Sequence, residues 1–448
     1  MKLKTRLTLI KDHPGFRKYF ANTSWLMGER ILRMAVSLFV GILVARYLGP
    51  ERYGLLSYAN SFVGIFIVLG TMGLDDIIVR ELVKTPEQQE KILGSSFLLK
   101  LVGTLLMWMA ILAAVPFTKN DFQTNILIII IAFGAVFQAF NVIDFNFQAK
   151  VKSKFIVHAQ FVQLIISSIV KIILVVNETP LIWFASVYCL DAIVLAMGLI
   201  FVYFYNGNNI FHWKWSFETS KYLLRDSWPL MFAGVVVSVY MKIDQVMIKE
   251  MLGAKEVGLY AAAVKLSEAW YFLPLAITSS LFPAIINAKL YQKEDYFQRL
   301  QKLYDLMVWA SVAVALPTTI LADWVILILY GTDFQEAADV LRIYIWGGVF
   351  VSLGIASSKW LVAENLQRYL FYGTALGALL NVGCNLWLIP IYGIKGAAFA
   401  TLVAQGTVGF LSLSFFKKTR HNFLLAAKSL SIYGAYKRTF QKIIIRGR

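Results

Sequence analysis

The stretch "WLMGERILRMAVSLFVGILVARYLG", residues 25–49, has the length and the apolar composition of a helix that crosses a bilayer. It nevertheless carries Glu29, Arg30 and Arg33 in its first half. On insertion scales a charged side chain at the centre of a spanning helix costs about 2.5–3.5 kcal/mol, whereas a leucine or isoleucine returns only about 0.3–0.6 kcal/mol. The two arginines are therefore predicted to face protein or water and not lipid.

These charges lie deep in the predicted span. At 1.5 Å per residue, Arg33 is about 16 Å into a helix that starts near residue 22, which is close to mid-membrane. Arg30 and Arg33 share a helix face, and Glu29 lies four residues before Arg33, so one carboxylate partly compensates two guanidiniums. One interpretation is an ion pair that joins two helices. The favoured one is a cationic wall for an anionic ligand, because positive charge is left over and guanidiniums suit phosphate oxygens.

The rest of the chain has the same membrane character. Of its 448 residues, 58% are hydrophobic and only 15% are charged, against about 25% charged residues in a typical soluble protein. The composition predicts an all-α polytopic membrane protein. Hydropathy indicates twelve transmembrane helices, at 22–48, 54–75, 92–116, 124–147, 155–176, 181–205, 226–251, 257–288, 304–330, 338–362, 369–390 and 394–416.

The basic residues predict the orientation of these spans. Thirty lysines and arginines fall on the side of the membrane that holds the N-terminus, and seven fall on the opposite side. Because cytoplasmic segments carry the excess of positive charge, both termini are predicted to be cytoplasmic. The net charge of +17 then reflects topology and gives no reason to expect a nucleic-acid partner. The basic C-terminal tail is predicted to lie on anionic lipid.

An internal repeat divides the chain. "LGPERYGLLSYA" at 48–59 matches "LGAKEVGLYAAA" at 252–263, an offset of 204 residues, and each copy forms the predicted short turn between the first two spans of its half. Since each half holds an even number of spans, the repeats are parallel, as in alternating-access transporters built from two facing lobes. The expected organisation is an N-lobe at 1–205, a cytoplasmic linker at 206–225, a C-lobe at 226–417 and a basic tail at 418–448.

Further charged residues lie within other spans. Those with a candidate role in binding an anionic headgroup are Lys242, Lys265 and Lys171, and those with a candidate role in charge compensation or ion coupling are Asp244, Glu268, Asp144 and Asp191, in addition to Glu29. Asp244, on the repeat partner of the first span, is singled out as the carboxylate that takes up a proton or a cation. The alternative for Asp244 is a salt bridge to a lysine.

Enzymatic motifs are not found. The sequence has no P-loop, no HExxH and no GxSxG, and its outward loops are too short to hold an active site. We therefore expect no catalytic residue, no metal centre and no cofactor. Without a nucleotide-binding loop, transport is expected to be driven by an ion gradient (H⁺ or Na⁺), by the membrane potential or by the gradient of the ligand.

Three stretches carry a family resemblance: "LVARYLGPERYGLLSYANSF", "IDQVMIKEMLGAKEVGLYAAAVKLSEAWYFLP" and "LNVGCNLWLIPIYGIKGAAFAT". They resemble the bacterial polysaccharide-export flippases of the oligosaccharidyl-lipid/polysaccharide branch of the multidrug exporter superfamily, in the order that the family has them. The resemblance implies two six-helix lobes in a V, and arginines on the first helix that bind a diphosphate, which Arg30 and Arg33 match. It also implies a multi-pass protein of the bacterial cytoplasmic membrane.

By the same resemblance, the substrate is an undecaprenyl-diphosphate-linked oligosaccharide that moves to the outer leaflet for surface polysaccharide assembly. The implied partners are this lipid-linked oligosaccharide and membrane lipids, with polysaccharide polymerase and chain-length machinery as further candidates. Two alternatives stay open at the sequence level. One is a cation-coupled multidrug exporter with an acidic or apolar cavity, and the other, less favoured, is a membrane polymerase or glycosyltransferase.

Overall fold

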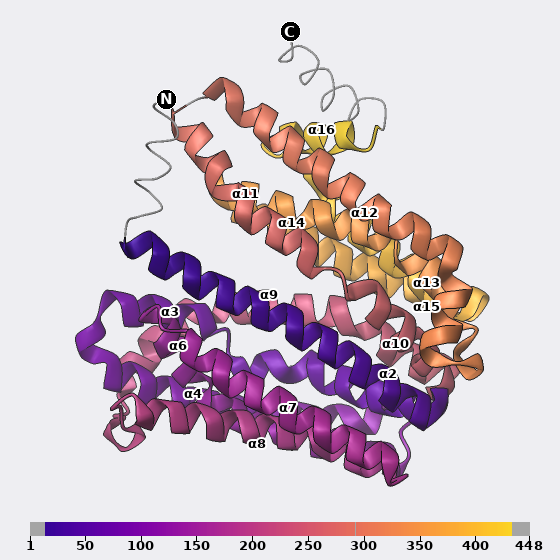
Figure 1. Ribbon diagram of the computed structural model, residues 1–448, viewed down its shortest axis with the longest axis horizontal. Helices are drawn as coiled ribbons and strands as arrows, with labels where there is room; N and C mark the ends of the chain where they lie inside the picture. Colours follow the sequence, from indigo (N-terminus) through magenta and orange to yellow (C-terminus); the bar gives the residue numbers. More distant parts are fainter. Residues whose placement is uncertain (1–13, 292, 432–448) are drawn as a thin grey trace. The chain divides into compact units, whose positions relative to one another are not determined.

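The computed structural model describes residues 14–291 and 293–431, and this part of the chain is almost entirely helical (Figure 1). Nine of its helical stretches are long and apolar enough to cross a membrane. This confirms a helical polytopic membrane protein. The nine stretches are 32–84, 86–117, 122–149, 154–176, 181–205, 217–252, 296–330, 337–363 and 367–414.

The chain forms two compact units, each with its own core. Unit 1 holds the described residues up to Leu48 together with Tyr58–Ser238, and unit 2 holds Gly49–Ser57 and the described residues from Val239 onward. Because segment 49–57 belongs to unit 2, the chain passes between the units more than once.

Unit 1 is built around seven helices. Helix α7 packs along α8, which also packs along α5, while the short helix α3 packs on α6. Its core includes Ile78, Leu93, Val142 and Tyr203. The helices of unit 1 are α2 (Pro14–Thr71, apart from 49–57), α3 (Asp75–Lys84), α4 (Gln89–Ala114), α5 (Phe122–Gly134), α6 (Val142–Ala149), α7 (Lys154–Val176) and α8 (Leu181–Tyr205), and it also holds the first part of α9 (Phe217–Leu252).

Unit 2 holds the last part of α9 and the helices that follow it. Helix α14 packs along α15 and also on α12, around a core that includes Leu300, Tyr304, Leu353 and Trp360. The helices of unit 2 are α10 (Ala254–Glu268), α11 (Phe272–Tyr291), α12 (Lys293–Tyr330), α13 (Ala337–Tyr344), α14 (Gly347–Ala363), α15 (Gln367–Gly409) and α16 (Arg420–Ser429).

The two copies of the repeat pack against each other inside unit 2. Gly49 and Gly253, which are equivalent in the repeat, both have a positive φ, at 68° and 107°, a conformation that glycine adopts without strain. A Cβ on Gly54 would overlap the carbonyl oxygen of Ala254, and a Cβ on its equivalent Gly258 would overlap that of Pro50. The two copies therefore form a symmetrical contact, backbone against backbone, that only glycine permits at these two positions.

Helix α15 also contains a glycine with a positive φ, and the chain reverses direction there. Gly393 has φ 60° and ψ −142°, which breaks the helix into two arms. A Cβ on Gly396 would overlap the carbonyl oxygen of Leu388, so the arms lie against each other just beyond the break. This tight reversal brings side chains from both arms of α15 to one place in unit 2.

Candidate functional site

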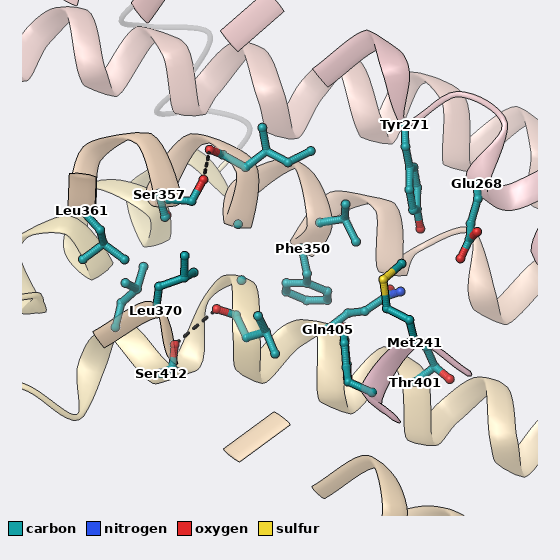
Figure 2. A pocket seen from close by; sticks show the side chains of 18 of the residues that line it. Met241, Glu268, Tyr271, Phe350, Ser357, Leu361, Leu370, Thr401, Gln405 and Ser412 are labelled. Carbon is teal, nitrogen blue, oxygen red and sulfur yellow. Dashed lines mark hydrogen bonds between the residues drawn. The ribbon is translucent and has the colours of Figure 1, made fainter. Parts of the chain in front are cut away.

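Unit 2 contains a cavity of about 270 Å³. Figure 2 shows Glu268, Tyr271 and Thr401 toward one of its ends, with Leu361 and Leu370 at the other. Its wall comes mainly from α9, α14 and α15, with further residues from the end of α10 and the segment after it, from the end of α13 and from the short 3₁₀ stretch Leu411–Ser414. One end of the cavity is thus acidic and the other end is apolar.

Asp244, on α9, is buried at the acidic end, with only 4% of its surface exposed. Its Oδ2 lies 2.8 Å from the Tyr260 hydroxyl and 2.5 Å from Thr401 Oγ1. Its Oδ1 accepts a hydrogen bond of 2.6 Å from Asn385 Nδ2. All three partners are neutral, and among the described residues no cation lies within ion-pair distance of Asp244. The salt bridge considered as the alternative for Asp244 is not formed.

Two asparagines extend this cluster. Asn381 and Asn385 are one turn apart on the first arm of α15 and are completely buried. Asn385 Nδ2 also lies 3.3 Å from Asn381 Oδ1, while Asn385 Oδ1 has no hydrogen-bond partner within the described part of the chain. A buried amide oxygen without a partner is costly, and here it sits next to a carboxylate.

The second arm of α15 closes the cluster. Thr401 Oγ1 lies 3.0 Å from the Ala397 carbonyl oxygen and 3.0 Å from the Tyr260 hydroxyl. Carboxylate, amide, hydroxyl and carbonyl oxygens therefore meet within a few ångströms. Hard cations prefer such oxygen donors, so the arrangement is chemically able to hold a monovalent cation against the single negative charge of Asp244.

A second carboxylate, Glu268, lies at the same end of the cavity and accepts a 3.0 Å hydrogen bond from the Tyr344 hydroxyl. Tyr344 packs edge-on against Tyr260, with ring centroids 6.1 Å apart. Lys242 and Lys265 are half-buried, and neither has a carboxylate within 4 Å in the described part of the chain. The structure does not pair Lys265 with Glu268, although the two lie one turn apart.

Arg33 lies in unit 1 and binds α7. Its Nη1 donates to Gln163 Oε1 at 3.1 Å, and its Nη2 donates to the Gln160 carbonyl oxygen at 3.2 Å. Both acceptors are neutral, and the two bonds orient the guanidinium. The side chains of Glu29 and Arg30 lie outside the described residues.

The remaining predicted residues of unit 1 are spread over different helices. Lys171 Nζ lies 2.8 Å from Ser167 Oγ and 3.5 Å from Asp191 Oδ2, which joins α7 to α8. Asp144, on α6, accepts a 3.1 Å hydrogen bond from Gln148. Lys171 and Asp191 thus form an ion pair between neighbouring helices, and Asp144 is not part of it. Of the predicted residues, the structure brings Asp244 and Glu268 to one cavity and places Arg33 in the other unit.

Sequence reasoning missed the neutral partners of Asp244. It singled out charged residues, whereas Tyr260, Asn381, Asn385 and Thr401 carry no charge. A usable signal was present in "NVGCN", where two asparagines one helical turn apart lie within an apolar span. Paired amides are costly in hydrocarbon unless they face a polar partner, so their spacing points to a polar site.

Comparison with known proteins agrees with this fold. Residues 19–289 match the family described as "Polysaccharide biosynthesis protein", and residues 229–387 match the MatE family. The first match covers more than half of the chain, so the protein belongs to the polysaccharide biosynthesis protein family. This confirms the family that the motifs resembled.

Several relatives are named as flippases. The chain is 23% identical over 195 residues to the "probable low-salt glycan biosynthesis flippase Agl15" of Haloferax volcanii, which covers 43% of this chain and 41% of that protein. The match therefore spans about two fifths of the length of this relative. The relatives named by function are flippases and not enzymes, which confirms the expectation of a transporter.

Two solved structures share the fold. A "Lipid II flippase MurJ, inward closed conformation" has a TM-score of 0.70 at 17% identity, over 94% of this chain and 96% of that one. An inward-facing multidrug resistance MATE family transporter of the MOP superfamily has a TM-score of 0.67 at 16% identity, over 92% and 96%. At this identity the likeness concerns the fold alone.

Proposed function

We propose that the protein is a flippase that moves an undecaprenyl-diphosphate-linked oligosaccharide from the inner to the outer leaflet of the bacterial cytoplasmic membrane, for surface polysaccharide assembly. The observation that carries the proposal is the polysaccharide biosynthesis family match over residues 19–289. The similarity to a glycan biosynthesis flippase supports it. The proposed architecture is twelve spans in two six-helix lobes, with both termini cytoplasmic.

In this proposal, positive side chains hold the diphosphate while the polar headgroup crosses. Arg30 and Arg33 on α2 are the principal pair, and Lys242, Lys265 and Lys171 are the further candidates. Arg33 is suited to the task because its two bonds to α7 fix the guanidinium, and a fixed fork loses less entropy when it binds phosphate oxygens. Polymerase and chain-length proteins are proposed partners that receive the product.

The coupling ion is proposed to be Na⁺, bound by Asp244 with Asn381, Asn385, Thr401 and the Ala397 carbonyl. The Asp244 oxygens already face three groups that can donate hydrogen bonds. If Asp244 were protonated, its own hydroxyl would be a hydrogen-bond donor and would face groups that already donate to Asp244. A cation, by contrast, uses the oxygens that converge here. Glu268 adds negative charge at the same end of the cavity.

A second function has an observation in its favour. The acidic end of the cavity in unit 2 and the MatE match over 229–387 fit a cation-coupled multidrug exporter. Such a protein would bind an apolar organic cation and not a lipid diphosphate. Efflux of ethidium from cells, with normal surface polysaccharide in a deletion strain, would favour this function over the flippase.

The direct test uses purified protein in liposomes that contain a fluorescent lipid-linked oligosaccharide, with an impermeant quencher to report the outer leaflet. Arg33→Gln is expected to lower the initial rate of translocation at least tenfold, because a phosphate-binding cation is lost. Arg46→Gln is the matched control, since Arg46 is an exposed arginine in the same arm of α2, shortly before the break at Gly49. Equal rates for Arg33→Gln and wild type would reject the phosphate role of Arg33, and no translocation by wild type would reject the function.

A further inference from the structure

The cavity of unit 2 extends well beyond the Asp244 cluster. Along α14 its wall runs from Phe350 to Leu361, a separation of eleven positions and therefore roughly 16 Å along the helix. Figure 2 shows the acidic end at Glu268 and Thr401, Phe350 near the middle, and Leu361 and Leu370 at the other end. That other end lies where α14 stops at Ala363 and α15 begins at Gln367.

The wall presents more apolar than polar surface, but polar side chains are spaced along its length. About half of the lining side chains carry a hydroxyl, amide or carboxylate group, among them Ser357, Ser358 and Ser412 away from the acidic end. The Tyr271 hydroxyl and Gln405 Oε1 are buried in the wall, and neither makes a hydrogen bond of normal geometry within the described residues. A cavity of about 270 Å³ has room for several water molecules, and polar partners are what keeps such water in place.

We propose that this cavity is an aqueous path along which a monovalent cation reaches Asp244 from the end of unit 2 where α14 meets α15. The inference rests on the proposed coupling role of Asp244. By the distribution of basic residues, that end is the predicted cytoplasmic face. The path lies wholly within unit 2.

Phe350 lies part-way along the path. It lines the cavity between its two ends, and α14 packs against α15 beside it so closely that a Cβ on Gly409 would overlap the Phe350 carbonyl oxygen. The backbones of the two helices are therefore tightly packed beside Phe350.

Cysteine labelling tests the path in the full-length protein. Cys189 and Cys384 are both free and are first replaced by alanine. Ser358→Cys then places a thiol in the cavity, while Leu379→Cys places one on an exposed apolar stripe of α15, where Leu379 is 73% and Leu386 is 60% exposed. The probe is the impermeant cationic reagent MTSET, added to one face of the membrane at a time, because only a hydrated thiol ionises and reacts.

We expect Ser358→Cys to react at least tenfold faster than Leu379→Cys, from the predicted cytoplasmic face only. Saturating Na⁺ is expected to slow the reaction at least threefold, and to have no effect once Asp244→Asn is added. Ile355→Cys, on the same wall, is a second position with the same expectation. Labelling needs no lipid substrate, so its result is independent of whether the protein moves lipid-linked oligosaccharide.

Two results would overturn the inference. If neither cavity thiol reacts faster than Leu379→Cys from either face, the cavity is dry. If the thiols react but Na⁺ does not change the rate in the protein with Asp244 intact, the water there does not lead a cation to Asp244.

Discussion

Substitution of Gly54 by alanine tests the symmetrical contact between the two repeat copies. The added Cβ would overlap the Ala254 carbonyl oxygen and would lie 2.8 Å from the Gly258 nitrogen. Ordinary van der Waals contact begins at 3.4 Å, so even the nitrogen must move by about 0.6 Å, and the carbonyl by more. Both obstacles are backbone atoms in helices, which cannot turn aside as a side chain does.

The cost follows from this geometry. Overpacking of a tight interface costs about 1–3 kcal/mol and more where backbone must shift, so we expect Gly54→Ala to destabilise by about 3 kcal/mol. Gly258→Ala is expected to cost a similar amount, because its Cβ meets Pro50 in the equivalent way. The double variant should cost much less than the sum, since one displacement of the two segments makes room for both methyl groups.

The assay is thermal unfolding of the purified protein in detergent, followed by the loss of the monodisperse peak on size exclusion. Gly383→Ala is the control, because Gly383 lies inside α15 and the methyl group that alanine adds there would meet no atom within 4 Å. Alanine at this position should be neutral or stabilising by up to about 1 kcal/mol. An unfolding temperature for Gly54→Ala within 1 °C of wild type, on the order of experimental error, would refute the reasoning about this contact.

Three further predictions concern polar groups. Thr401→Val should weaken Na⁺ binding about tenfold in a calorimetric titration while Thr401→Ser retains it, because only the hydroxyl faces Asp244; equal affinities would remove Thr401 from the site. Lys171→Met alone should destabilise by about 2 kcal/mol, whereas the Lys171→Met, Asp191→Leu double variant should unfold near wild type, because an unpaired charge left within a membrane-spanning helix costs more than the loss of both charges; the reverse order would contradict a structural ion pair. Burial, and then repulsion from Glu336, raise the pKa of Glu256 above 4.5 although Lys255 opposes this, so the folded state favours the protonated form and stability should fall as pH rises from 4.5 through the raised pKa. The stability of Glu256→Gln should not fall over this pH range. If wild type and Glu256→Gln show the same pH dependence of unfolding, Glu256 is not the source of the effect.

The positions of most spans could be predicted from hydropathy, because apolar length is what the bilayer selects. The spans expected at 155–176 and 181–205 correspond to α7 at Lys154–Val176 and α8 at Leu181–Tyr205. Local chemistry also explains one departure. The span expected at 257–288 is interrupted between Glu268 and Phe272, since the ring of Pro274 clashes with the carbonyl of residue 270, four positions earlier.

Other departures had no local signal. The span expected at 124–147 contains a 3₁₀ stretch at Ala135–Asn141 without a proline to cause it. The turn expected between the first two spans is a break at the single residue Gly49, after which helix resumes at once. Such details depend on which backbones approach one another, and this is decided by packing between segments far apart in the sequence.

The candidate site likewise has one part that a local sequence signal predicts and another part that depends on packing between distant segments. Asp244 could be singled out because a carboxylate within a span demands an explanation. Its partners could not be assigned, because Tyr260, Asn385 and Thr401 are 16, 141 and 157 residues away. Asn385 and Thr401 meet only through the reversal of α15 at Gly393. Arg33 was likewise predicted to face protein or water, but nothing in the pattern pointed to Gln163 on α7 as its acceptor.

Translocation under an imposed Na⁺ gradient tests the central claim most directly. Liposomes that hold the protein and a fluorescent lipid-linked oligosaccharide are diluted into buffers that set the gradient in either direction, and the initial rate of headgroup transfer is measured for wild type and Asp244→Asn. We predict that wild type is several-fold faster in one gradient direction than in the other, and that Asp244→Asn loses this difference. Equal wild-type rates in both directions, or an undiminished difference in Asp244→Asn, would contradict a flippase coupled to a cation at Asp244.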